Sequence, residues 1–176
     1  TLSAKLGTIG TVLLLMALAS ISLTLWVTWQ LEGGAAAVNE AGRMRMQTWR
    51  LASAVQTSLA PKELNALVSL FDESLLLLRK GDASRPLFVP WDADVDVKFK
   101  QVEKLWAQRR GQWLARPSLT PAESATAAEE FVTAIDTLVL SIEYHLSRLT
   151  AILNLFQFVM MALAIVGAVV MLFTGY

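Results

Sequence analysis

The chain has 176 residues, with 15 Lys and Arg balanced by 15 Asp and Glu, and 55% of its residues are hydrophobic. This composition excludes an intrinsically disordered chain, because disordered segments combine few apolar residues with a high net charge. The absence of cysteine excludes disulfide frameworks, iron–sulfur clusters and thiolate zinc sites. The single histidine argues against a His-rich metal site, and the net charge of zero gives no reason to expect nucleic acid as a partner.

Two long segments, Leu6–Leu31 and Leu149–Tyr176, carry no charged residue. A helix of about 20 apolar residues spans the hydrocarbon core of a bilayer, so both segments are long enough. We therefore predict transmembrane helices over residues 6–31 and 149–174, with a lipid bilayer as a partner. A cleaved signal peptide is the less favoured interpretation of the first segment, because its apolar run is too long and no A-x-A site closes it.

The residues between these two spans, 35–148, are predicted to form a periplasmic sensory domain made of helices. Proline and glycine divide this segment, and we expect helices over residues 35–59, 61–80 and 91–115 and from 120 into the second span. Apolar residues recur at helical spacing and no segment alternates with period two, so we expect no strands. The predicted fold class is all-α, an antiparallel four-helix bundle between two transmembrane helices.

Local signals mark two of the helix boundaries. Thr120, Pro121 and Glu123 have the spacing of a capping box, with proline at the first helical position, which predicts the start of the last helix. We expect the helix from residue 35 to be continuous with the first span, with Gly33 and Gly34 interrupting the exit of that span and softening it.

An arginine occupies a position of the first helix that its pattern otherwise gives to small or apolar residues. The predicted contact face reads Val38, Ala41, Arg45, Thr48, Ala52, Val55 and Leu59, in steps of three and four. A charge at such a contact is costly unless it finds a partner. The partner is either a carboxylate of the same bundle or water, or an anion shared with a second copy of the helix.

The shared anion follows if two copies pair about a twofold axis, the commonest oligomer symmetry. Two Arg45 side chains about 5 Å apart would repel by roughly 3 kcal/mol at an effective dielectric of about 20, and an anion between them reverses the sign. The guanidinium fork matches planar oxyanions, and Gly42 could offer exposed backbone one turn away. The sequence therefore allows an oxyanion site as one alternative for the partner of Arg45.

The segment Asn39–Leu51 reads N-E-A-G-R-M-R-M-Q-T-W-R-L and resembles N-x-A-G-S-L-R-M-Q-S-Y-R-L, the signature of nitrate/nitrite sensor histidine kinases of the NarX/NarQ type. Leu87–Trp91 and Phe131–Val139 are also similar to that family. A related signature, A-G-R-x-R-M, is found in the sensory domains of type IV pilus chemoreceptors, which are the second resemblance. Arg43 replaces a serine of the kinase signature and Trp49 replaces its tyrosine.

The first resemblance implies a homodimer through the first helix, in the bacterial inner membrane, that binds nitrate or nitrite and relays the signal across the membrane. Arg45 and Gly42 would bind the anion, with Arg43, Met44 and Met46 as candidate neighbours. The chain would be the sensory part of a two-component sensor histidine kinase. The cytoplasmic output region is expected to be absent here, and a response regulator would bind only to that region. The alternatives are the sensory part of a chemotaxis-type (type IV pilus) transducer, and a structural membrane hairpin without a ligand.

No catalytic constellation is present in the sequence, and we expect neither a cofactor nor a metal. Asp92, Asp94, Asp96 and Glu103 have the spacing of a calcium loop, but Val97 stands where such a loop needs glycine. Acidic residues in the first turn of a helix are the favoured interpretation. Whether the full-length protein is an enzyme depends on the resemblance to histidine kinases.

Overall fold

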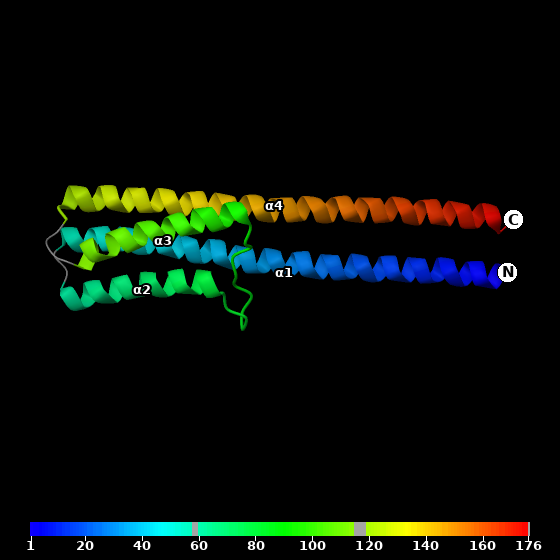
Figure 1. The fold of residues 1–176 in the computed structure, drawn as a ribbon, viewed down its shortest axis with the longest axis horizontal. Coiled ribbons are helices and arrows are strands. Elements are labelled where there is room, and N and C mark those ends of the chain that lie inside the picture. The colour runs from blue at the N-terminus through cyan, green and yellow to red at the C-terminus, as the bar shows by residue number, and fades with distance from the viewer. Residues whose placement is uncertain (58–59, 115–118, 176) are drawn as a thin grey trace. The chain divides into compact units, whose positions relative to one another are not determined.

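The computed structural model describes residues 1–57, 60–114 and 119–175. Over these residues the chain forms four helices and no strand, and the single isolated bridge pairs Asp82 with Leu87 (Figure 1). The helices are α1 (Leu2–Gln56), α2 (Pro61–Lys80), α3 (Ala93–Leu114) and α4 (Pro121–Thr174). The all-α prediction is confirmed. Leu59, the last residue of the predicted contact face, and Ala115, the predicted end of the third helix, lie outside the described residues.

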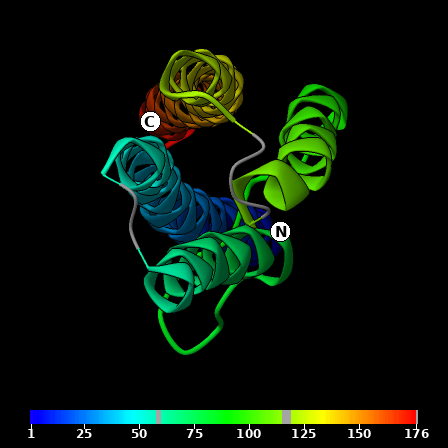
Figure 2. The same ribbon diagram turned by 90° about the vertical axis from the view of Figure 1, so that its left-hand side faces the viewer.

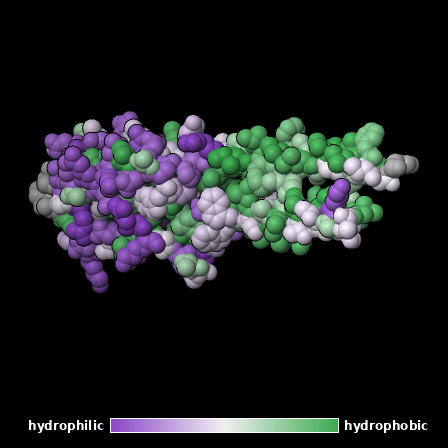
Figure 3. Space-filling view, turned by 45° about the vertical axis from the view of Figure 1, so that its right-hand side comes forward, coloured by the Kyte–Doolittle hydropathy of each residue, from purple (hydrophilic) through white to green (hydrophobic). Residues whose placement is uncertain are grey.

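The chain divides into two compact units, of which the first consists of Thr1–Gln30 and Ser147–Tyr176. Its parts of α1 and α4 contain 18-residue windows with mean hydropathies of 2.1 and 2.5, and neither window has any residue buried in the protein. On the face that Figure 3 shows, most of this unit's surface is hydrophobic. Helices of this length and composition, uncovered by other protein, are those that can cross a membrane.

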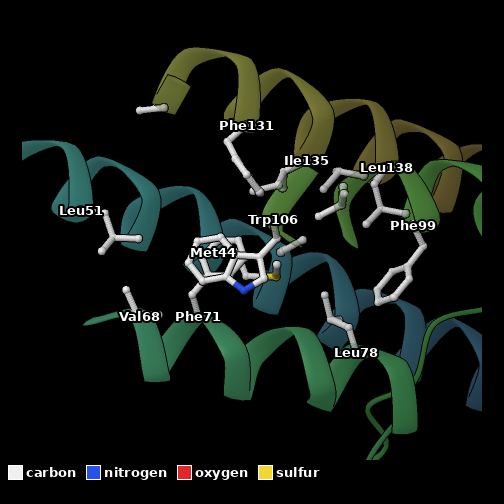
Figure 4. Packing of buried hydrophobic residues seen from close by; sticks show 14 of the residues in the cluster. Met44, Leu51, Val68, Phe71, Leu78, Phe99, Trp106, Phe131, Ile135 and Leu138 are labelled. Carbon is white, nitrogen blue, oxygen red and sulfur yellow. The ribbon is translucent and has the colours of Figure 1, made fainter. Parts of the chain in front are cut away.

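The second unit, Leu31–Leu146, is the helical bundle. Seen along their axes, its helices surround one core in the order α1, α2, α3 and α4 (Figure 2). Phe71 of α2 stacks on Trp106 of α3 with ring centroids 4.0 Å apart, and Phe131 of α4 packs edge-on against both rings. Met44 of α1 completes this aromatic layer from the fourth side and is fully buried (Figure 4). Burial of such side chains contributes about 1.5–3 kcal/mol each.

The starts of α2 and α4 agree with the prediction to within one residue, whereas α3 begins at Ala93, two residues after the predicted start at Trp91. The Thr120 N–H donates to Glu123 Oε2 at 2.9 Å, and the Glu123 N–H donates to Thr120 Oγ1 at 3.2 Å, which is the reciprocal capping box. Pro61 is the first residue of α2, where its missing N–H is not needed. Asp92 precedes α3, and its Oδ1 accepts a hydrogen bond of 2.7 Å from the Val95 N–H, as an N-cap does.

The expected interruption at Gly33 and Gly34 is wrong, because α1 runs through both residues without a break. Their role is close packing. A Cβ on Gly33 would overlap the ring of Phe88, and a Cβ on Gly34 would lie 2.7 Å from a methyl group of Leu146 on α4. The Phe88 N–H also donates to the Gly33 carbonyl at 3.3 Å. Glycine here lets the α2–α3 connection and α4 approach α1 closely.

The connection between α2 and α3 is ordered but irregular. Gly81 ends α2 with a φ of 72°, which only glycine adopts without strain. Asp82 then holds the turn, accepting hydrogen bonds from the Ser84 N–H and hydroxyl at 3.0 and 2.6 Å. These bonds, chiefly the one from the Ser84 side chain, hold the pKa of Asp82 below its usual value.

Candidate functional site

The signature segment 39–51 lies on α1 in the middle of the bundle, and its residues divide among the faces of that helix. The face toward the core is fully buried and consists of Ala37, Ala41, Met44, Thr48 and Leu51. Arg45 lies beside this face, toward α4, and Arg43 lies toward α2. Arg43 and Arg45 therefore lie on different surfaces of the bundle.

Arg45 is paired with a carboxylate of its own chain. Its Nη1 donates to Asp136 Oδ1 of α4 at 2.5 Å, and the two side chains are 40% and 46% exposed. This is one of the alternatives that the sequence left open. Pairs at this exposure contribute about 0.2–1 kcal/mol, because solvent screens them and ordering two long side chains is costly. The contact joins α1 to α4 but adds little to the stability of the bundle.

Gly42 and Arg45, the two residues predicted to bind an anion, do lie together. The position that a Cβ would take on Gly42 is 3.6 Å from Nη2 of Arg45, and apart from the adjacent residues and backbone of α1, no other heavy atom of the described residues comes within 4 Å. In the described part of the chain, the guanidinium makes its hydrogen bond through Nη1 alone. Nη2 thus lies over an open glycine surface and retains donor capacity.

The three candidate neighbours of this site differ in their surroundings. Met44 is fully buried in the core. Met46 and Arg43 line a groove between α1 and α2, where Arg43 Nη1 lies 3.7 Å from Glu40 Oε2. The buried Met44 therefore does not contribute to the Arg45–Gly42 surface, whereas Met46 lies one turn from Gly42 on the exposed side of α1.

The groove between α1 and α2 contains polar residues that the sequence analysis did not single out. Glu40 and Gln47 of α1 and Ser74 of α2 line it and are buried, with exposures of only 3 to 4%. The Ser74 hydroxyl donates to Glu40 Oε1 at 2.7 Å, whereas Gln47 Oε1 is buried without a hydrogen-bond partner. The spacing of seven residues between Glu40 and Gln47, both on one helix face, was the available signal.

The acidic residues of α3 are each engaged by a different group. Asp92 Oδ2 lies 2.7 Å from His145 Nδ1 of α4, and Asp94 accepts a hydrogen bond from the Ser141 hydroxyl. Burial raises the pKa of Asp92, but hydrogen bonds from the Val95 N–H and from His145 outweigh it, so this pKa lies below its ordinary value. Within the described ranges, no three His, Asp or Glu side chains are grouped to hold a metal ion.

A comparison with protein families matches residues 26–136 to the family described as PilJ, the N-terminal part of type IV pili methyl-accepting chemotaxis transducers. The match covers more than half of the chain, including the signature segment, α2, α3 and the first half of the bundle part of α4. No curated protein matches the chain. The finding supports the second of the two resemblances, to chemoreceptor sensory domains, and gives no support to the nitrate/nitrite sensor kinases.

Proposed function

The chain belongs to the family of type IV pili methyl-accepting chemotaxis transducer N-terminal domains, and from this premise we propose that it is the sensory part of a chemotaxis-type transducer. The family match is the observation that carries the proposal. The two apolar helices support it, since a transducer must be anchored in the membrane that its signal crosses. The chain is accordingly a membrane protein of signal transduction. We place its bundle on the periplasmic side of a bacterial inner membrane.

The relay that we propose depends on the two long helices. α1 and α4 each contribute residues to the bundle and to the apolar unit without a break in the helix. A ligand shifts a conformational equilibrium only if it binds two states with different affinity. In this proposal the two states are two arrangements of α1 against α4 in the bundle, which the Arg45–Asp136 pair helps to set.

A homodimer through α1 is part of the same proposal. The outward face of α1 carries Gly42 together with Met46 and Trp49, whose side chains are 50% and 48% exposed. Large apolar side chains beside a glycine are suited to close contact between two helices, because the glycine lets the backbones approach. Pairing about a twofold axis would cover this face in both copies.

Cysteine labelling tests the topology that the proposal requires. The chain contains no cysteine, so a single introduced one is a clean reporter. Ser69→Cys lies on the exposed side of α2, and Ser3→Cys lies at the start of α1. In cells with a permeabilised outer membrane, a membrane-impermeant maleimide should label Ser69→Cys at once and Ser3→Cys only after lysis. Labelling in the opposite order would contradict the proposal.

Nitrate or nitrite binding at Arg45 and Gly42 is the second candidate. The open Gly42 surface beside Nη2 of Arg45 favours it, because a planar oxyanion could bind there while Nη1 keeps its bond to Asp136. The carboxylate of Asp136 weakens the case for nitrate binding, because the chain itself supplies the negative charge that an external anion was expected to supply.

Calorimetric titration of the purified chain with sodium nitrate tests this second candidate. Binding that is lost in Arg45→Ala and retained in Arg85→Ala, an exposed arginine of the α2–α3 connection, would support the anion site. Equal heats from wild type and Arg45→Ala would exclude it, and the transducer proposal does not depend on the result.

A further inference from the structure

We propose that the groove between α1 and α2 is a binding site for a zwitterionic small molecule, an α-amino acid with an apolar side chain. The groove has a volume of about 250 Å³ and lies on the α2 side of α1, whereas Arg45 and Asp136 lie on the α4 side. Its size is below that of pockets for drug-sized ligands, which begin at about 300 Å³, and is suited to a single amino acid.

The floor of the groove contains side-chain oxygens that accept fewer hydrogen bonds than they can. Glu40 is a carboxylate with a 4% exposed side chain, and a carboxylate can accept about four hydrogen bonds. Within the described residues it accepts one, from Ser74, and its other oxygen is 3.7 Å from Arg43. The buried Oε1 of Gln47 accepts none. Buried polar atoms are nearly always satisfied, so an unpartnered acceptor on the floor points to a donor that the protein itself does not supply.

The rim of the groove carries two exposed arginines beside one exposed carboxylate, Glu73. Arg43 has a 52% exposed side chain, and its ion pair with Glu40 is too long for a hydrogen bond. Arg50, two turns further along α1, is also exposed, and over the described ranges it forms no ion pair. Two guanidinium groups with free donors at one opening are suited to a carboxylate, which the fork binds through two oxygens at once.

The charge balance selects a zwitterion over a simple ion. Arg43 and Arg50 are offset by Glu40 and Glu73, so the groove as a whole is neutral. An anion alone would leave the acceptors on the floor unpaired, and a cation alone would leave the arginines of the rim unpaired. A molecule with an ammonium group, which has three N–H donors, and a carboxylate satisfies both sets.

Apolar side chains complete the groove. Met46 of α1 and Leu70 and Leu77 of α2 line it beside the polar groups. Leu70 is 41% exposed, so a ligand side chain that covers it would gain the burial of apolar surface. The site therefore favours an apolar amino acid over a polar or charged one. That the groove is a sensory site rests on the proposed function, but binding of an amino acid in the groove can be measured separately.

Thermal unfolding of the full chain in detergent, with the standard L-amino acids as probes, tests the inference. At about 10 mM ligand and a Kd of about 1 mM, we expect an apolar amino acid to raise Tm by roughly 3 °C. For leucine, the matched analogues are 4-methylpentanoate, which lacks the ammonium group, and 3-methylbutylamine, which lacks the carboxylate. Neither analogue should produce the shift. A Tm unchanged by every amino acid, or an equal shift with either analogue, would overturn the proposal.

Variants of the groove provide the second arm. Gln47→Leu removes the unpartnered acceptor, so the unliganded bundle should unfold no earlier than wild type while the ligand-induced shift is lost. Arg43→Gln should also lose the shift, and Arg85→Gln, which is remote from the groove, should keep it. A full shift in Gln47→Leu would contradict the assignment. Because this assay measures binding and the maleimide labelling measures topology, failure of one proposal is distinguishable from failure of the other.

Discussion

Replacing Gly33 by alanine tests whether the close approach of the α2–α3 connection to α1 stabilises the bundle. Two effects oppose each other. Alanine is preferred to glycine inside a helix by about 1 kcal/mol. A Cβ on Gly33 would, however, overlap the ring of Phe88, with Cδ1 only 2.6 Å away, so the ring must leave its position. Overpacking of this kind typically costs about 1–3 kcal/mol, and we expect Gly33→Ala to lower the free energy of unfolding by about 1 kcal/mol.

Gly111 is the matched control for this substitution. It lies in α3, and a Cβ there would meet no atom of the described residues within 4 Å other than those of its own helix, so Gly111→Ala should raise the free energy of unfolding by about 0.5–1 kcal/mol. Urea unfolding followed by near-ultraviolet circular dichroism, which reports on the aromatic core, measures both. Adding Phe88→Ala removes the obstacle, and in that background Gly33→Ala should become stabilising. If Gly33→Ala is stabilising in the wild-type background, the packing argument is refuted.

Two further predictions concern the helix starts. Thr120→Ala removes the capping box of α4 and should lower the free energy of unfolding by about 1 kcal/mol in the same urea assay, whereas Thr120→Ser should leave it nearly unchanged. The pKa of Asp92 is lowered in the folded chain, so its contribution to stability is present above its ordinary value near 4 and is lost as the pH falls through the lower folded value. Stability measured between about pH 6 and 2 should therefore fall more steeply in wild type than in Asp92→Asn, and parallel curves would contradict the assignment.

The sequence predicted helices more reliably than it predicted contacts between them. The start of α4 followed from Thr120, Pro121 and Glu123, because a capping box is a local interaction within four residues. The extent of α2 followed from Pro61 and Gly81 for the same reason. These features depend on backbone chemistry that neighbouring residues determine, without any knowledge of how the helices pack.

The partner of Arg45 depends on the register of α1 against α4, which joins residues 91 positions apart in the chain. Helical phase placed this arginine at a contact but could not choose between Asp136 and an external anion. The same limit applies to Gly33. In the sequence alone, a glycine indicates a break in a helix, and only the position of Phe88 shows that Gly33 allows close packing. Glu40 was overlooked because a glutamate on a helix is usually exposed, and its burial depends on Ser74 of another helix.

Arg43 is the residue of the signature segment 39–51 in which the two resemblances differ. Arg43 departs from the serine of the nitrate/nitrite sensor kinases and agrees with the A-G-R-x-R-M pattern of the chemoreceptor domains. In the structure this side chain lies over the α1–α2 groove and does not approach Arg45. The residue at which this chain departs from the kinase signature therefore lies on a different surface from Arg45.

The central claim is that the packing of α1 against α4 in the bundle controls an output beyond the membrane. Its most direct test joins the chain after Tyr176 to the cytoplasmic part of a chemotaxis transducer and measures the activity of the coupled kinase in membranes. Arg45→Asp and Asp136→Arg each place like charges at this contact, and the double substitution restores an opposite pair in the reverse orientation. We predict that each single substitution changes kinase activity several-fold and that the double substitution returns it toward the wild-type level. Equal activity in all four folded proteins would contradict the account.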